Sequence, residues 1–146
     1  MPSLCAMHPK DLKGDKIMNT CFHGNTIPEV HKYDIWFAAL PGAAPGNRVI
    51  SGPRPVVVVS ADESNQACPV ITVVPLTSHL DKPQNSTHAL ITANEISQLE
   101  CNSRALAAHI STIDKSLLRW RIGRVDDAFE QLSLQHAMAV QLGLTA

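Results

Sequence analysis

Short apolar runs with a period of two occupy the chain from residue 33 to about residue 125, and they predict β-strands. The segment 33–40 (YDIWFAAL) alternates between two faces, as a strand does. The β-branched runs 55–60 and 70–76 have the composition of buried strands and are bounded by Pro, Asp or Asn. Further candidate strands span residues 88–92, 104–111 and 120–125. Six short strands without long helices between them predict antiparallel pairing in a small barrel or in paired sheets.

The last segment of the chain changes to a helical pattern. Asp126 and Asp127 suit the start of a helix, and Gly143 suits its end. Apolar residues between them fall near helical spacing, namely Ala128, Phe129, Leu132, Ala139 and Leu142. The predicted fold class is therefore mainly β, with one C-terminal α-helix.

Residues 1–32 show neither the strand period nor the helix period for more than a few positions. We predict a loosely ordered N-terminal extension, 1–32, ahead of one domain, 33–146, which we expect to fold without the extension. The extension carries Cys5-x-x-His8 and Cys21-x-His23, and thiol plus imidazole is suitable chemistry for zinc. Because the second pair is too tightly spaced for the usual zinc spacer, we expect no metal site.

Composition and charge narrow the class of protein. Of the 146 residues, 45% are hydrophobic, which is enough for one core and excludes disorder over the whole chain. Twelve Lys and Arg against 13 Asp and Glu leave a net charge of −1, so any nucleic-acid contact must be a local site. No apolar run approaches the ~20 residues that cross a bilayer, and the N-terminus has no secretory apolar region. We therefore expect a cytoplasmic protein with no membrane partner.

An ordered series of segments resembles the MazF/PemK family of toxins from bacterial type II toxin–antitoxin pairs. The segments are YDIWFAAL, SGPRPVVVVS, VITVVPLTS, STHALI, ALAAHISTIDKSLL and RIGRV, followed by the terminal helix. The resemblance covers roughly residues 33–143. It implies a small SH3-like β-barrel, MazF/CcdB-like, of six or seven strands with a C-terminal helix. It also implies a homodimer, metal-independent and cofactor-free cleavage of single-stranded RNA, sequence selectivity, and inhibition by a cognate antitoxin.

Cleavage of this kind uses the ribose 2′-OH as an internal nucleophile on the adjacent phosphate. The site then needs a cation, a hydrogen-bond donor to the phosphate oxygens, and groups that move two protons. Arg54 matches the family's Arg in the RP motif, and its planar guanidinium suits phosphate. Thr77, in PLTS at the end of a strand, is the candidate donor, and the neighbouring Ser78 could share that role.

The proton-transfer group is where the chain departs from the family. Family members commonly carry an acidic residue followed by Gln ahead of the I-x-T-x-D segment, and here the matching pair is Ala108-His109. Alanine moves no proton, whereas imidazole is well suited to acid–base work. In a regular strand, however, Ala108 and His109 point to opposite faces unless a bulge intervenes. His109 is thus a candidate for catalysis or substrate binding without being a direct replacement.

Three other residues have an open role. His88, in STHALI, matches a family His and is predicted to be structural or to contact the substrate. Arg48, in the Pro/Gly-rich loop, is either a contact that helps to cover RNA or a solvated loop residue. Trp36 is predicted to fill the core rather than to stack on a base.

The missing acid keeps a second function class open. A module of the same fold that has lost catalysis would bind antitoxin or RNA without cutting. A third class, the related CcdB toxins that target DNA gyrase, is disfavoured by the RP and PLTS motifs.

Overall fold

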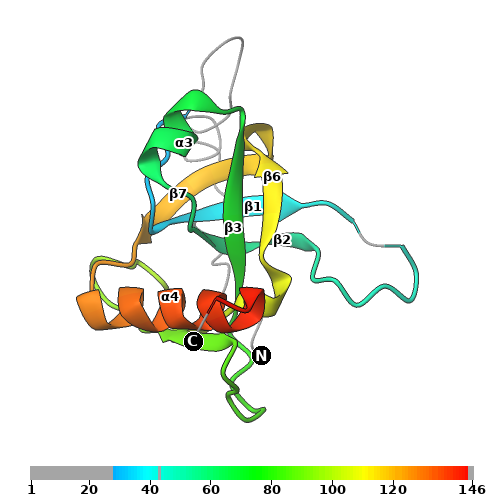
Figure 1. Ribbon diagram of the computed structural model, residues 1–146, viewed down its shortest axis with the longest axis vertical. Coiled ribbons are helices and arrows are strands. Elements are labelled where there is room, and N and C mark those ends of the chain that lie inside the picture. Colours follow the sequence, from blue (N-terminus) through cyan, green and yellow to red (C-terminus); the bar gives the residue numbers. More distant parts are fainter. Residues whose placement is uncertain (1–27, 43, 145–146) are drawn as a thin grey trace.

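The computed structural model describes residues 28–42 and 44–144, and within these ranges it contains seven β-strands and two α-helices (Figure 1). The strands are β1 (Asp34–Leu40), β2 (Gly52–Val58), β3 (Val70–Thr77), β4 (His88–Ile91), β5 (Ser103–Leu106), β6 (Ser111–Asp114) and β7 (Leu118–Arg124). The helices are α3 (Asp62–Ala67) and α4 (Ala128–Leu142). Two single 3₁₀ turns, η2 (Ala107–His109) and η3 (Lys115–Leu117), flank β6.

All the strand pairs are antiparallel, and the described strands follow the order β4-β5-β3-β2-β1-β7, with β6 pairing to β3. The long strand β3 joins two parts of the sheet, because its first residues pair with β6 and its last two pair with β5. The predicted fold class, mainly antiparallel β with a C-terminal helix, is confirmed. The sheet is barrel-like in its curvature but does not close fully along its hydrogen-bonded path.

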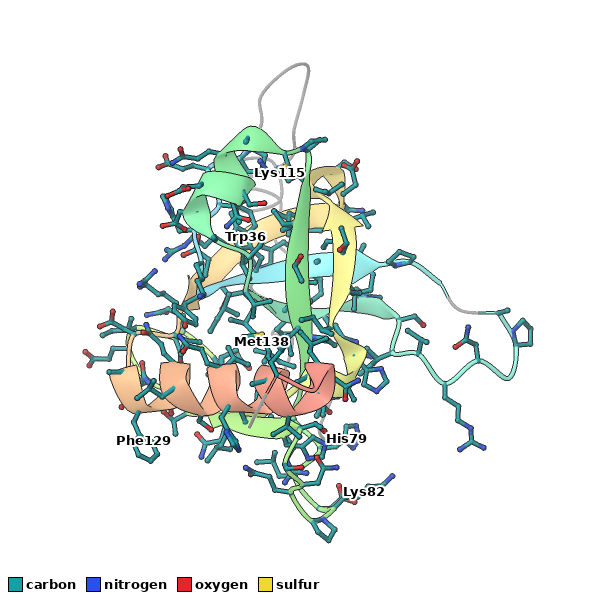
Figure 2. The ribbon with its side chains drawn as sticks, in the orientation of Figure 1. Trp36, His79, Lys82, Lys115, Phe129 and Met138 are labelled. Atoms are coloured by element: carbon teal, nitrogen blue, oxygen red, sulfur yellow. The ribbon has the colours of Figure 1, made fainter. Side chains whose placement is uncertain are left out.

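The sheet is buried on both faces, because successive strand residues point to opposite sides. One apolar cluster includes Ile35, Val57 and Leu134 of α4, and the other includes Trp36, Val56 and Ile113 of β6. Trp36, a residue of β1, is 5% exposed and lies in the interior of the molecule (Figure 2). The prediction that Trp36 fills the core is confirmed.

The C-terminal helix begins and ends where the sequence predicts. The Asp127 side chain accepts hydrogen bonds from the backbone N–H groups of Phe129 and Glu130, which otherwise have no partner in the first turn. Gly143 follows the helix with a φ of 69°, a left-handed conformation that glycine adopts without strain. Met138 faces the sheet, whereas Phe129 points away from it and is 80% exposed (Figure 2). The helix therefore covers β4 and η2 with one face.

The predicted strand 104–111 is wrong as a single element. The chain forms β5 up to Leu106, turns through η2 at Ala107–His109, and resumes as β6 at Ser111. β5 and β6 both pair with β3, at different ends of that strand, and the turn carries the chain from one pairing to the other. A local sequence of alternating apolar residues does not reveal such a change of pairing.

Residues 28–32 belong to the packed part of the molecule. Val30 is 4% exposed within the second apolar cluster. The backbone N–H of His31 donates to the Asp34 carboxylate at 2.9 Å, and that of Lys32 donates to the Asp62 carboxylate at 2.7 Å. We therefore propose that the domain begins before Val30 rather than at residue 33.

Two truncations test this boundary. A chain that begins at residue 33 is expected to be less stable than one that begins at residue 28 by about 1.5 to 3 kcal/mol, because it lacks the buried Val30 side chain. Urea unfolding of both chains measures the difference. Equal midpoints would show that residues 28–32 contribute nothing, and the boundary at 33 would stand.

Candidate active site

Arg54, Thr77 and Arg104 lie on three neighbouring strands, β2, β3 and β5. The β2–β3 ladder ends with Val56 opposite Pro75, and Arg54 and Thr77 each lie two residues beyond that pair. On the other side of β3, Thr77 pairs directly with Arg104 of β5. Directly opposed residues in an antiparallel sheet project from the same face, with strands about 4.8 Å apart. We call these three residues the Arg–Thr–Arg row.

Arg54 is a half-buried cation without an acidic partner among the described residues. Its Nη2 donates to the Ser51 carbonyl at 3.1 Å, and its Nε is buried with no hydrogen-bond partner. Burial lowers the pKa of its guanidinium, because the charged form loses solvation. Pro53 and Pro55 restrict the backbone on either side. A half-buried guanidinium without an acidic partner is well suited to bind an anion.

Arg104 is a residue that the sequence reasoning missed. It is 7% exposed, and its Nη1 donates to the Lys82 carbonyl at 2.9 Å. Its Nε, like that of Arg54, is buried without a partner; in the described part of the chain the third such atom is Nε1 of Trp36. The signal in the sequence was an arginine inside the short apolar strand that also holds Ala105 and Leu106.

Thr77 lies at the last position of β3 and begins the loop that leads to β4. Its Oγ1 accepts a hydrogen bond from the backbone N–H of His79 at 3.2 Å, which uses a lone pair and leaves the hydroxyl proton to be donated. Ser78 follows it, half-buried, at the strand end. Figure 2 shows His79 and Lys82 in this loop, beyond the end of β3. The loop thus links the Thr77 hydroxyl to the carbonyl that Arg104 binds.

His88 and His109 each use Nδ1 as a hydrogen-bond acceptor. The Ile50 backbone N–H donates to Nδ1 of His109 at 3.2 Å, and the Asn85 backbone N–H donates to Nδ1 of His88 at 3.2 Å. Because a backbone N–H only donates, Nδ1 is unprotonated in both rings. The proton of each neutral imidazole is then on Nε2. Both histidines therefore present an N–H donor rather than a base.

The charge state of His88 supports this assignment. Burial, then the positive charge of Arg104 and the proximity of His109, lower the pKa of His88 below its ordinary value. His88 therefore stays neutral near pH 7. The same interactions show that His88, Arg104 and His109 lie near one another at one end of the sheet.

Ala108 lies at the middle of the η2 turn and is exposed. The strand alternation expected for Ala108 and His109 does not apply, because this segment turns. His109 instead reaches the backbone at Ile50, in the loop between β1 and β2 that leads to Arg54. Arg48, two residues earlier in that loop, is exposed. A hydrogen bond thus connects His109 to the β1–β2 loop, which leads to Arg54. Ala108 has no side-chain group that could transfer a proton.

No metal or membrane feature accompanies this site. Within residues 28–42 and 44–144, no group of three or more His, Cys, Asp or Glu side chains is arranged to hold a metal. Cys5, His8, Cys21 and His23 lie outside the described residues. None of the described helices combines the length and the apolar character that crossing a bilayer requires.

A separate pocket near the start of α4 has unfavourable charge for a nucleic acid. Its lining includes Glu95, Asp126 and Asp127, together with Asn94 and Ile96. Three carboxylates repel a phosphate backbone. The Arg–Thr–Arg row is therefore the better candidate for RNA chemistry.

Comparison with known proteins agrees with the fold. Residues 31–137 match the family described as PemK-like, MazF-like toxin of type II toxin-antitoxin system. Endoribonuclease EndoA of Bacillus subtilis is 30% identical over 115 residues, which are 79% of this chain and 96% of that protein.

Solved structures with a similar fold include MazF from Deinococcus radiodurans, with a TM-score of 0.62 and 18% identity over 82% of this chain and 99% of that one. An endoribonuclease in complex with its cognate antitoxin, from a mycobacterial species, has a TM-score of 0.61 and 19% identity over 80% of this chain and 98% of that one. These likenesses support the fold described above.

Proposed function

The chain belongs to the PemK-like, MazF-like toxins of type II toxin–antitoxin systems, and on that premise we propose that it is an endoribonuclease that cuts single-stranded RNA without a metal. The observation that carries the proposal is the Arg–Thr–Arg row. It sets a hydroxyl donor beside a half-buried arginine whose Nε has no partner. An RNA phosphodiester supplies the anion that such a site lacks.

The proposed reaction is an internal transesterification. The ribose 2′-oxygen bonds to phosphorus and loses its proton, while the bond from phosphorus to the 5′-oxygen breaks and that oxygen gains a proton. The products are a 2′,3′-cyclic phosphate and a 5′-hydroxyl. Arg54 binds the non-bridging oxygens and offsets the charge that develops on them, and Thr77 donates a hydrogen bond to the same phosphate. We propose that Ser78, the next residue, assists Thr77.

The two histidines have a limited part in this chemistry. With Nδ1 occupied by a backbone N–H, His109 and His88 offer Nε2–H as a hydrogen-bond donor to the RNA. Neither takes the 2′-OH proton in this arrangement, and Ala108 has no carboxylate to do so. Water is then the proton acceptor, and we propose that cleavage is slow for this family.

The absent base also favours the second candidate function, a module that binds RNA or antitoxin without cutting. Exposed Ala108 and the two acceptor Nδ1 atoms are the observations in its favour. The row of cations would still hold RNA in such a module.

The remaining attributes are proposed from the family. We propose a cytoplasmic homodimer that selects its RNA sequence and is neutralised by a cognate antitoxin. The solved complex of a mycobacterial endoribonuclease with its antitoxin supports the antitoxin partner. Arg48, exposed on the β1–β2 loop, is a proposed contact to the RNA.

A cleavage assay in EDTA separates the two candidate functions. The purified protein, incubated with an unstructured RNA of mixed sequence, is expected to yield fragments ending in a cyclic phosphate, with an Arg54→Ala preparation as the control for contaminating ribonuclease. Mass spectrometry identifies the ends. Binding without fragments would favour the non-catalytic module, and activity restored by Mg²⁺ alone would contradict the metal-free reaction.

A further inference from the structure

Arg104 carries a buried positive charge that the proposed mechanism does not use. Among the described residues, Arg104 forms no ion pair, and its hydrogen bond to the Lys82 carbonyl occupies Nη1 alone. A cation that is 7% exposed is expensive to bury unless an anion or several acceptors compensate it. Its Nε is a buried hydrogen-bond donor without an acceptor, which adds to the energetic cost of burying this side chain.

The position of Arg104 indicates which partner. Arg104 on β5 is directly opposite Thr77, and Arg54 lies on β2, at the other edge of β3, two residues beyond the pair Val56–Pro75, so the two arginines lie on either side of the strand that carries the hydroxyl. Their backbones are two strand spacings apart, or about 9.6 Å. Two cations at this separation along one face suit successive phosphates of an extended strand better than one small anion.

Neighbouring groups favour an anion at the same place. His88 lies close enough to Arg104 for the arginine to lower the pKa of the imidazole, which keeps the histidine neutral and able to donate Nε2–H. Arg104, His88 and Thr77 together present donors, and no carboxylate pairs with Arg104 within the described ranges. The Lys82 carbonyl accepts a hydrogen bond from Nη1 alone, so this carbonyl does not neutralise the positive charge of the guanidinium.

We infer that the guanidinium of Arg104 binds a second phosphate of the RNA, adjacent to the one bound by Arg54. This inference rests on the proposed function, since it takes RNA as the ligand. It makes Arg104 a substrate-binding residue that extends the site beyond the scissile phosphate.

Salt dependence of binding tests the inference without relying on cleavage. Each phosphate contact to a single strand adds about 0.7 to the slope of log K against log salt. The probe is a fluorescent 2′-O-methyl RNA of mixed sequence, which has no free 2′-OH and is not cut. Fluorescence anisotropy at several salt concentrations gives the slope for each variant.

Arg104→Gln removes the charge and, because its side chain is shorter, also the hydrogen bond to the Lys82 carbonyl. Arg104→Lys keeps the charge but loses the planar guanidinium with its several donors. We expect Arg104→Gln to bind roughly ten- to a hundredfold more weakly, with a slope smaller by about 0.7. Arg104→Lys should keep the parent slope. The matched control is Arg119→Gln, because Arg119 on β7 also donates Nη1 to a backbone carbonyl, that of Ser116 at 2.9 Å, and lies outside the row.

A parent slope in Arg104→Gln, or an equal loss in Arg104→Lys, would overturn the inference and leave Arg104 as an anchor of the 78–87 loop. Circular dichroism and a thermal melt show whether each variant is folded, and if Arg104→Gln is not, the Arg104→Lys slope decides. If the parent cuts RNA but the Arg104→Gln slope is unchanged, the inference about Arg104 is wrong and the proposed function stands. If the parent neither binds nor cuts RNA, both the inference and the proposed function are wrong.

Discussion

Arg54→Ala is expected to lower the rate of RNA cleavage by roughly a hundred- to a thousandfold while the protein stays folded. The guanidinium lies on β2, the strand next to the one that carries Thr77, and it is already partly desolvated. Loss of one such preorganised donor to a transition state raises the barrier by ~2.7 to 4 kcal/mol. Single-turnover cleavage of a fluorescent RNA measures the loss directly.

Two further variants show whether a loss of rate is specific to the proposed active site. Thr77→Val keeps the shape of the side chain and removes the hydroxyl, so it should lower the rate by a similar factor if both groups bind the same phosphate. Arg119→Ala changes a strand arginine outside the row and should cleave at the parent rate. Parent rates in both Arg54→Ala and Thr77→Val would mean that the active site lies elsewhere.

Ala108→Glu is expected to raise the cleavage rate, by up to about a hundred- to ten-thousandfold, which is the contribution typical of a positioned general base. Ala108 is exposed on η2, next to His109 and near the end of the sheet that holds the row, so a longer side chain has room there. The new carboxylate would accept the 2′-OH proton that water accepts in the parent. Initial rates at neutral pH for both proteins give the gain.

The pH profile distinguishes this account from one in which His109 is the base. With water or hydroxide as the acceptor, the parent rate should keep rising from pH 5 to 9. In the Ala108→Glu variant, the rate should rise as the introduced carboxyl loses its proton at about pH 4 to 5 and then level off. An imidazole base would instead leave an inflection in the pH profile of the parent, and His109→Ala would abolish that inflection.

The hydrogen bond from Ile50 is the reason to expect no such inflection. For Nε2 of His109 to accept a proton while Nδ1 accepts from the Ile50 N–H, the ring would first have to lose its Nε2 proton. A large loss in His109→Ala with little gain in Ala108→Glu would show that this hydrogen bond breaks during the reaction. The base would then be the imidazole.

Elements with a local signal were predictable from the sequence. The strands β1, β2 and β3 follow from period-two or β-branched runs, and α4 follows from Asp127 and Gly143 at its ends, because caps and periodicity are properties of a few neighbouring residues. The family segments likewise marked Arg54 and Thr77 as the candidate cation and the candidate donor, and these roles stay predictions.

Features that depend on strand pairing were not predictable in this way. The break of 104–111 into β5, η2 and β6 arises because the chain leaves one end of β3 and returns at the other. Val30 joins the core because it packs under the sheet, although its neighbours in sequence show no period. Both are contacts between segments far apart along the chain.

The sequence by itself determined the mainly β fold class, the terminal helix, the family resemblance and the missing acid at Ala108. The tertiary structure decided that Arg104 lies beside Thr77, and that the proton of His109 is on Nε2. The physical reason is that a side chain's chemistry depends on what surrounds it. The register of β3 with β2 and β5 brings residues 54, 77 and 104 into one row, and a backbone N–H from residue 50 selects the tautomer of residue 109.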